Sequence, residues 1–214
     1  MSHHHVGHPS LVCSAMLAAL VWCGPLAAQE RMPPIPAETM SGAQRQAATA
    51  FAAVRKTPPT GPFAVMLRVP ELMDLTFQWR EHVQFRNVLN QRQAEFVILL
   101  TARHWTQQYV WNSHEPPALK AGLKPEIIAA VAEGRRPMQM AEDEAVLYDL
   151  CAELQQNHGV SDATYARALA TFGEPGIVEA TSTAGYYSLL AMVMNTARTP
   201  VPTGAKPPLA PFPR

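Results

Sequence analysis

The chain has 214 residues, of which 48% are hydrophobic and 16% are charged, so it can bury one good core and is not intrinsically disordered. Its 17 basic and 17 acidic side chains give a formal net charge of zero. Because no net field attracts a polyanion, this balance disfavours nucleic acid and an anionic membrane surface as partners.

Residues 1–28 are expected to form a signal peptide. Residues 11–22 are an uninterrupted apolar run, and small residues precede Gln29, as is typical of a cleavage site. This pattern predicts a periplasmic or secreted protein. The first ten residues contain four histidines but no lysine or arginine. An uncleaved apolar anchor and an incorrectly assigned start codon therefore stay open as alternatives.

Two of the three cysteines, Cys13 and Cys23, lie in that segment, so an exported chain would keep only Cys151 and could form no intrachain disulfide. Cys151 shares an apolar helical face with Leu147 and Leu154. This favours a buried cysteine over a reactive thiol.

The remaining chain is predicted to be all-α. Residues 29–60 are expected to comprise a proline-rich arm and a first helix, and residues 199–214 a proline-rich tail. We expect both arms to be extended and to lie outside the folded core. Residues 61–198 carry helical patterns throughout and show no convincing strand alternation, so they are expected to form the main helical domain.

The first predicted helix covers residues 41–56, with Ser41 as its N-cap. A second begins at Pro70, and its expected core stripe is Leu72, Leu75, Trp79 and Val83. Asn90 is predicted to cap a third, with Gln93 at the capping-box position. Later helices are predicted at residues 125–133, 142–157, 161–172 and 175–198. The last is long and apolar, so we expect it to be central or at a subunit interface.

Polar side chains are unusually frequent in residues 95–114. One straight helix would hold Glu95 and His114 about 28 Å apart. A break at Thr106, whose hydroxyl can cap a new helix, would place Gln107, Val110, Trp111 and His114 on one face of that helix. A reversal at this point could bring His104, Glu95 and His114 towards one cleft.

The chemistry that these residues favour is acid/base catalysis by a histidine that a carboxylate or amide orients. The spacing between His104 and His114 is not a compact metal-binding spacing, and the chain has neither a Cys/His cluster nor a serine-hydrolase GxSxG motif. We therefore expect no metal and no cofactor. The alternative is structural: both histidines are satisfied core or surface residues, and Glu95 pairs with Arg92, Arg103 or another arginine.

Residues 61–73, Phe85-Arg86, the Glu95-to-His114 stretch and residues 121–128 together resemble the carboxymuconolactone decarboxylase family. Its superfamily includes the alkylhydroperoxidase AhpD. The resemblance covers roughly residues 61–198. It implies an AhpD-like helical bundle in a homo-oligomer, often a trimer or hexamer, with a break between two helices near Thr106.

The resemblance to the AhpD branch implies a Cys-x-x-Cys pair at the positions of Gln107 and Val110, and neither is a cysteine. A thiol peroxidase needs a peroxidatic thiolate and a resolving partner. Peroxidase activity is therefore the least favoured function.

The resemblance to the decarboxylase branch implies a site with an oxyanion stabiliser, a proton donor and a carboxylate anchor. It implies His114 as the acid/base, Glu95 as its orienting partner, and His104 and Gln107 as donors to the oxyanion. Arg103 or Arg92 would hold the substrate carboxylate, and Trp111 would form an apolar wall. The expected partner is a small carboxylate or lactone. A non-catalytic protein that binds an aromatic metabolite or serves in assembly is the alternative.

Overall fold

A computed structural model describes Met1, residues 29–202 and residues 209–210. The described residues form helices and no strand, which confirms the all-α prediction. Apart from Met1, the predicted signal peptide lies outside the described residues. None of the described helices is long and apolar enough to span a bilayer.

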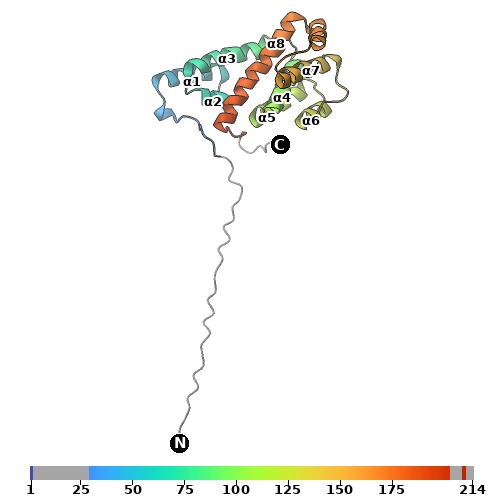
Figure 1. The fold of residues 1–214 in the computed structure, drawn as a ribbon. Helices are drawn as coiled ribbons and strands as arrows, with labels where there is room; N and C mark the ends of the chain where they lie inside the picture. The colour runs from blue at the N-terminus through green and yellow to red at the C-terminus, as the bar shows by residue number, and fades with distance from the viewer. Residues whose placement is uncertain (2–28, 203–208, 211–214) are drawn as a thin grey trace.

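Three helices pack on one side of the molecule (Figure 1). They are α1 (Gly42–Arg55), α2 (Pro62–Met66) and α3 (Pro70–Phe85), and a short 3-10 helix, Ala37–Thr39, precedes them. Ser41 caps α1 as predicted, because its hydroxyl accepts a hydrogen bond from the backbone N–H of Gln44, and the Gln44 side-chain oxygen accepts one from the backbone N–H of Ser41. The short helix α2 was not predicted; its first residue is Pro62.

Helix α4 (Gln91–His104) is enclosed by its neighbours. Every residue from Ala94 to Arg103 is buried. The helices that pack against it include α5 (Gln108–Lys120), α6 (Pro125–Ala132), α7 (Glu142–Asn157) and α8 (Asp162–Ala197). The predicted capping box of Asn90 and Gln93 is present at its start. Because α4 is surrounded, side chains from several helices can converge on it.

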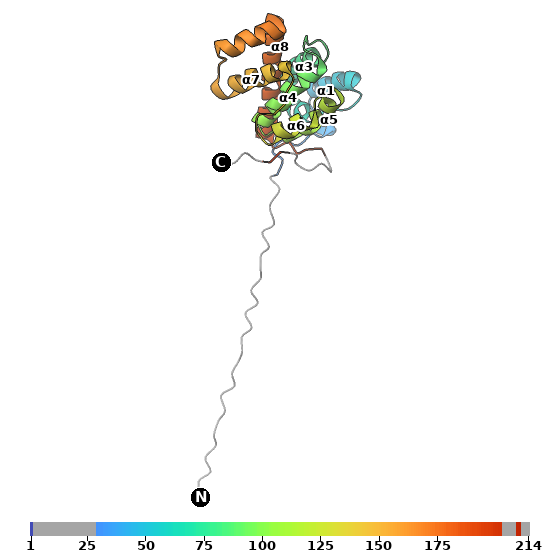
Figure 2. The same cartoon turned by 90° about the vertical axis from the view of Figure 1, so that its right-hand side faces the viewer.

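Helix α8 links the two halves of the molecule. It passes between α1–α3 on one side and α4–α7 on the other (Figures 1 and 2) and contacts α2, α3, α4 and α7. Gly173, with φ 65° and ψ 176°, interrupts it between the two helices predicted for this stretch. Tyr186, Tyr187 and Met194 are buried in its second part, which confirms that this helix is central.

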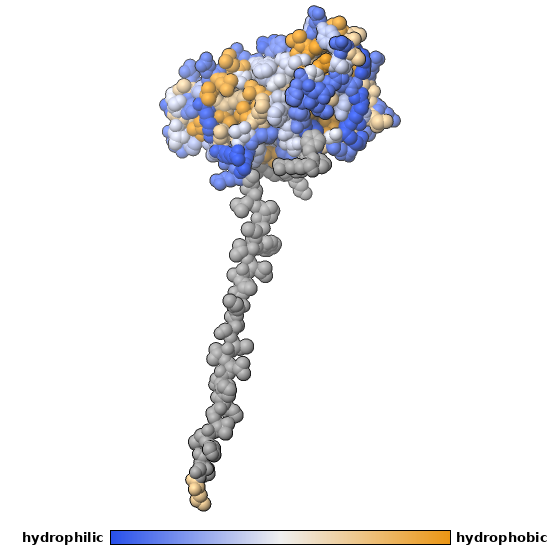
Figure 3. All heavy atoms as spheres, viewed as in Figure 1, coloured by the Kyte–Doolittle hydropathy of each residue, from blue (hydrophilic) through white to orange (hydrophobic). Residues whose placement is uncertain are grey.

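The predicted core stripe of α3 is wrong in three of its four members. Val83 is buried, but Leu72, Leu75 and Trp79 are 42%, 58% and 37% exposed. The buried face of α3 instead carries Met73 and Thr76. Hydrophobic surface is visible on the side of the molecule where α1 and α3 lie (Figure 3). Helical periodicity marks an apolar face but does not say whether that face contacts the chain's own core.

The proline-rich arms are also more attached than predicted. The backbone N–H of Arg31 donates to the carbonyl of Ala197 at 2.8 Å, and Ile35 packs against the core. Near the other end, Leu209 is 2% exposed, and its backbone N–H and carbonyl both bond the side-chain amide of Gln108. Isolated apolar residues therefore anchor both arms to the folded body.

The capping box of α4 gives a first prediction. Asn90→Ala should lower the free energy of unfolding by about 1 kcal/mol, because the N–H of Gln93 loses its acceptor. Urea denaturation followed by circular dichroism measures the change. Asn157→Ala, at the exposed last residue of α7, is the control and should change stability by less than about 0.5 kcal/mol. Equal effects of the two substitutions would contradict the capping role.

Candidate active site

The site depends on a sharp reversal between α4 and α5. Helix α4 ends at His104, Thr106 adopts the left-handed φ of 46°, and α5 begins at Gln108. The predicted break is therefore present, but the cap is Gln107 and not Thr106. The side-chain oxygen of Gln107 accepts hydrogen bonds from the backbone N–H groups of Tyr109, at 2.6 Å, and Val110, at 3.2 Å.

The reversal brings Glu95 and His114 together. Nδ1 of His114 lies 2.8 Å from Oε2 of Glu95, whose side chain is 4% exposed. Because an ionised carboxylate is only an acceptor, Nδ1 carries the proton and donates it to Glu95. Within the described residues Nε2 has no hydrogen-bond partner. The carboxylate therefore fixes the tautomer in which Nε2 can accept a proton.

The pair lies in the wall of a cavity of about 330 Å³. Six helices line it: α1, α2, α3, α4, α5 and α8. Its apolar wall includes Phe51, Phe63, Val110 and Leu190, and its polar groups include the following side chains: Arg55, Arg80, Gln84, Glu95, Tyr109, His114, Tyr186 and Tyr187. The volume and the mixed lining suit a small organic molecule with a few polar groups.

Two adjacent tyrosines of α8 contribute buried phenols to this cavity. The ring of Tyr187 packs edge-on against His114 at 4.9 Å, and the Tyr186 ring packs edge-on against Tyr187 at 5.1 Å. Burial raises the pKa of both hydroxyls. Both phenols therefore stay neutral near pH 7 and serve as hydrogen-bond donors. Gln84 donates to the Tyr187 oxygen at 2.8 Å, which leaves the Tyr187 hydrogen available.

Two arginines also line the cavity, and the sequence analysis did not identify either. Arg80 forms a salt bridge with its neighbour Glu81 at 2.6 Å. Arg55 forms no salt bridge within the described part of the chain. Burial lowers the pKa of Arg55, and the nearby charge of Arg80 lowers it further. No motif could have revealed them, because only the packing of α1 against α3 brings them together.

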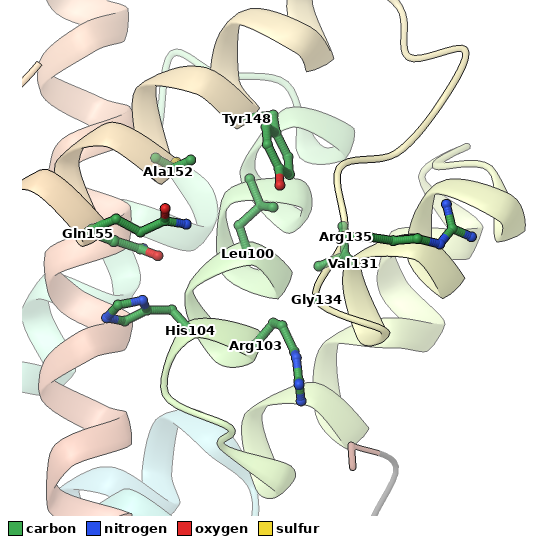
Figure 4. Close-up of a pocket in the computed structure, with 11 residues that line it drawn as sticks. Leu100, Arg103, His104, Val131, Gly134, Arg135, Tyr148, Ala152 and Gln155 are labelled. Atoms are coloured by element: carbon green, nitrogen blue, oxygen red, sulfur yellow. The ribbon is translucent and has the colours of Figure 1, made fainter. Parts of the chain in front are cut away.

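The structure does not bring His104 to the Glu95–His114 pair, contrary to the expectation of one cleft. His104 lines a separate, smaller cavity of about 80 Å³ together with Arg103, Tyr148 and Gln155 (Figure 4). Burial lowers the His104 pKa, and the charge of His158 adds to this effect. Arg103 donates to the carbonyl of Ala210 at 2.6 Å, so it lies at this second cavity and not beside the pair.

Gln107, Trp111 and Arg92 also lie outside the main cavity. The Gln107 oxygen caps α5 and its Nε2 donates to Asn195, so both ends of this amide are used within the fold. Trp111 is 1% exposed and its Nε1 donates to Glu115. Gln107 therefore supports the turn and Trp111 the core. Neither side chain lines the cavity, although both were predicted to belong to the site.

Arg92 is held by the acidic start of α7. It donates to Asp143 at 2.6 Å and also bonds Glu144. Its charge is therefore already neutralised at the junction of α4 and α7. Glu95 pairs with His114, and no ion pair joins it to Arg92 or Arg103 among the described residues.

Cys151 is a buried side chain in the wall of the smaller cavity. Burial raises the pKa of its thiol to about 12, so the thiolate is scarce at neutral pH. The other two cysteines lie outside the described residues. Among the residues that the structure describes, no group of three or more His, Cys, Asp or Glu side chains could hold a metal ion.

No protein-family model matches the chain, and no curated protein is similar to it in sequence. Solved structures do share its fold. One is an uncharacterised peroxidase-related protein from Ralstonia eutropha with an alkylhydroperoxidase AhpD core; the TM-score is 0.66 at 14% identity, over 81% of this chain and 93% of the other.

A second is a protein of unknown function from Agrobacterium tumefaciens, a candidate AhpD antioxidant defence protein. Its TM-score is 0.54 at 17% identity, over 64% of this chain and 95% of the other. The chain therefore has the AhpD-like helical fold, and at these identities the likeness concerns the fold alone.

The burial of Cys151 gives a second prediction. In the native protein near pH 8, iodoacetamide should alkylate Cys151 at least about tenfold more slowly than in urea, because the native thiol is buried and protonated. Mass spectrometry of the peptide that contains Cys151 measures the rate separately from the other cysteines. Equal rates in the two conditions would show an accessible thiol and contradict this assignment.

Proposed function

We propose that this protein is a cofactor-independent enzyme that performs acid/base catalysis on a small carboxylated or lactone substrate, by decarboxylation or by proton transfer. The observation that carries the proposal is the hydrogen bond between the buried Glu95 and His114, at a cavity of small-molecule size. A carboxylate that fixes the imidazole tautomer is a recurring device for general acid/base catalysis.

In a proton transfer, Nε2 of His114 takes a proton from a carbon next to the substrate carbonyl. The electron pair of the broken C–H bond moves to the carbonyl oxygen and forms an enolate. Tyr187, whose ring contacts the His114 ring and whose oxygen accepts from Gln84, would donate its hydroxyl hydrogen to such an oxyanion. The imidazolium, paired with Glu95, then returns the proton to a different carbon.

In a decarboxylation, the C–C bond to the leaving carboxylate breaks and carbon dioxide departs. The electron pair of that bond forms the same kind of enolate. Nε2 of His114, which has first taken a proton from solvent, then donates that proton to carbon, and His114 returns to its starting form. Both reactions use the same groups, and neither requires a thiol.

The alternative is a binding protein that holds an aromatic metabolite in the same cavity without proton transfer. The cavity wall, with Phe51, Phe63 and Tyr109, supports binding equally well. Thiol peroxidase chemistry has less support, because Gln107 caps a helix, Val110 is buried, and Cys151 is buried far along the chain. The peroxidase-related and antioxidant names describe the two structural neighbours.

The test is turnover of a panel of γ-carboxylated butenolides and related lactones, followed by carbon dioxide release and ultraviolet absorbance. His114→Asn should reduce kcat by about 10²–10⁴-fold, because the proton carrier is lost. Glu95→Gln should also reduce kcat, since an amide can no longer stabilise the imidazolium. A KM that stays nearly constant in both variants would place the loss in the chemical step.

The matched control is His82→Asn. Nε2 of His82 lies 2.7 Å from Glu179, so this is a second histidine–glutamate pair, and it does not line the cavity. Its substitution should leave turnover unchanged. Wild-type protein that binds panel compounds but converts none would support the binding alternative, and turnover that survives His114→Asn would rule out His114 as the acid/base.

A further inference from the structure

We propose that Arg55, Arg80 and Tyr186 form an anion subsite that holds a carboxylate of the ligand, and that this carboxylate remains in the product. The claim that this carboxylate remains in the product rests on the proposed function, whereas the binding of the carboxylate does not. Its ligand is a small carboxylate with an apolar or aromatic body.

The first observation is a pair of guanidinium groups in the cavity wall. Arg55 and Arg80 both line the cavity, and the carboxylate of Glu95 is already bonded to His114. The salt bridge between Arg80 and Glu81 uses one of the Arg80 nitrogens, Nη1. Arg55 forms no salt bridge within the described residues. Guanidinium groups with donors to spare bind carboxylates in bidentate geometry.

The second observation is the Tyr186 hydroxyl. The Tyr186 side chain is fully buried and lines the cavity, yet its oxygen has no hydrogen-bond partner among the described residues. Buried hydroxyls normally have a partner, so this one indicates a missing acceptor. Arg55, Arg80 and Tyr186 line the same cavity, and the charges of Arg80, Glu81 and Arg55 all act on the Tyr186 hydroxyl. A carboxylate between these three groups would satisfy all of them.

The third observation is how this subsite is connected to His114. The ring of Tyr187 contacts both neighbours: its centroid lies 4.9 Å from that of His114 and 5.1 Å from that of Tyr186. An anion bound at Tyr186 is therefore one residue removed from the Tyr187–His114 contact. The apolar wall of Phe51 and Phe63 can accommodate the hydrocarbon part of such a ligand.

The location of the positive charge determines what happens to the bound carboxylate. Two guanidinium groups stabilise a negative charge that stays on the carboxylate. Decarboxylation of that same group would move the charge away from them in the transition state, so the clamp would raise the barrier. The clamped carboxylate is thus an anchor. Any carbon dioxide lost must come from a second carboxyl group, nearer His114.

The test is isothermal titration of the full chain with benzoate and with benzamide, which has a similar shape but no charge. Wild type should bind benzoate and bind benzamide more weakly. Arg80→Gln and Arg55→Gln should each weaken benzoate binding by about tenfold to a hundredfold, since each removes a charged hydrogen bond. Tyr186→Phe should weaken it less, and benzamide binding should not change in any of the three variants.

Two controls separate the subsite from the rest of the protein. Arg86→Gln removes an exposed cation at the end of α3, outside the cavity, and should leave benzoate binding unchanged. His82→Asn, which changes a histidine–glutamate pair outside the cavity, should also retain benzoate binding. Thermal unfolding checks that each variant is folded. If an arginine variant does not fold, the Tyr186→Phe variant and the comparison of benzoate with benzamide in wild type test the subsite instead.

The proposal is overturned if wild type binds benzoate no better than benzamide, or if the arginine and Tyr186 variants bind benzoate as wild type does. Its failure is distinguishable from that of the proposed function. If benzoate binding depends on Arg80 but turnover does not depend on His114, the subsite is supported and the proposed reaction is not. If turnover depends on His114 but benzoate binding does not depend on Arg80, the reaction is supported and the subsite is not.

Discussion

The reversal between α4 and α5 is the constraint on which the site depends. Thr106 takes a left-handed conformation that is unfavourable for a β-branched residue, and two hydrogen bonds to the Gln107 side chain hold the first turn of α5 in place. Because α4 and α5 then run back along each other, a glutamate near the start of one helix meets a histidine in the middle of the other. Without this turn the two groups would lie far apart.

The Glu95 carboxylate is a costly group to bury, and the surrounding structure shows how that cost is offset. An unpaired ionised carboxylate in a protein interior is strongly unfavourable, whereas one that accepts a hydrogen bond from a histidine can be retained. In the remainder of α4 the buried positions are filled largely by apolar residues such as Phe96, Val97 and Leu99. Glu95 is the one carboxylate of α4, and its partner His114 lines the cavity. A buried polar pair at a cavity is more consistent with function than with stability.

Much of the fold could be predicted from the sequence, because its signals are local. The caps at Ser41 and Asn90, the break near Thr106 and the interruption near Gly173 each arise from a few neighbouring residues. The meeting of Glu95 and His114 followed from one such break. The exposed stripe of α3 could not be predicted, because which side of an amphipathic helix meets the core is decided by helices far away in sequence.

The same distinction explains the site. Arg55 and Arg80 come from different helices and have no common motif, so only tertiary packing reveals them. Conversely, His104 is close to the pair in sequence but lines another cavity, because a residue at the end of α4 need not share the face that carries Glu95.

The resemblance to the AhpD branch implies cysteines at positions 107 and 110, and in this chain the residues at both positions have structural roles. Gln107 caps α5 and bonds α8 through Asn195, and Val110 is 2% exposed in the core. A thiol pair at these positions would remove the cap as well as add redox chemistry. This chain therefore has a glutamate–histidine pair next to a turn that is built from groups unable to transfer electrons. What remains at the cavity is a proton acceptor, neutral phenol donors and two cations, and this set is suited to moving protons on an anchored anion.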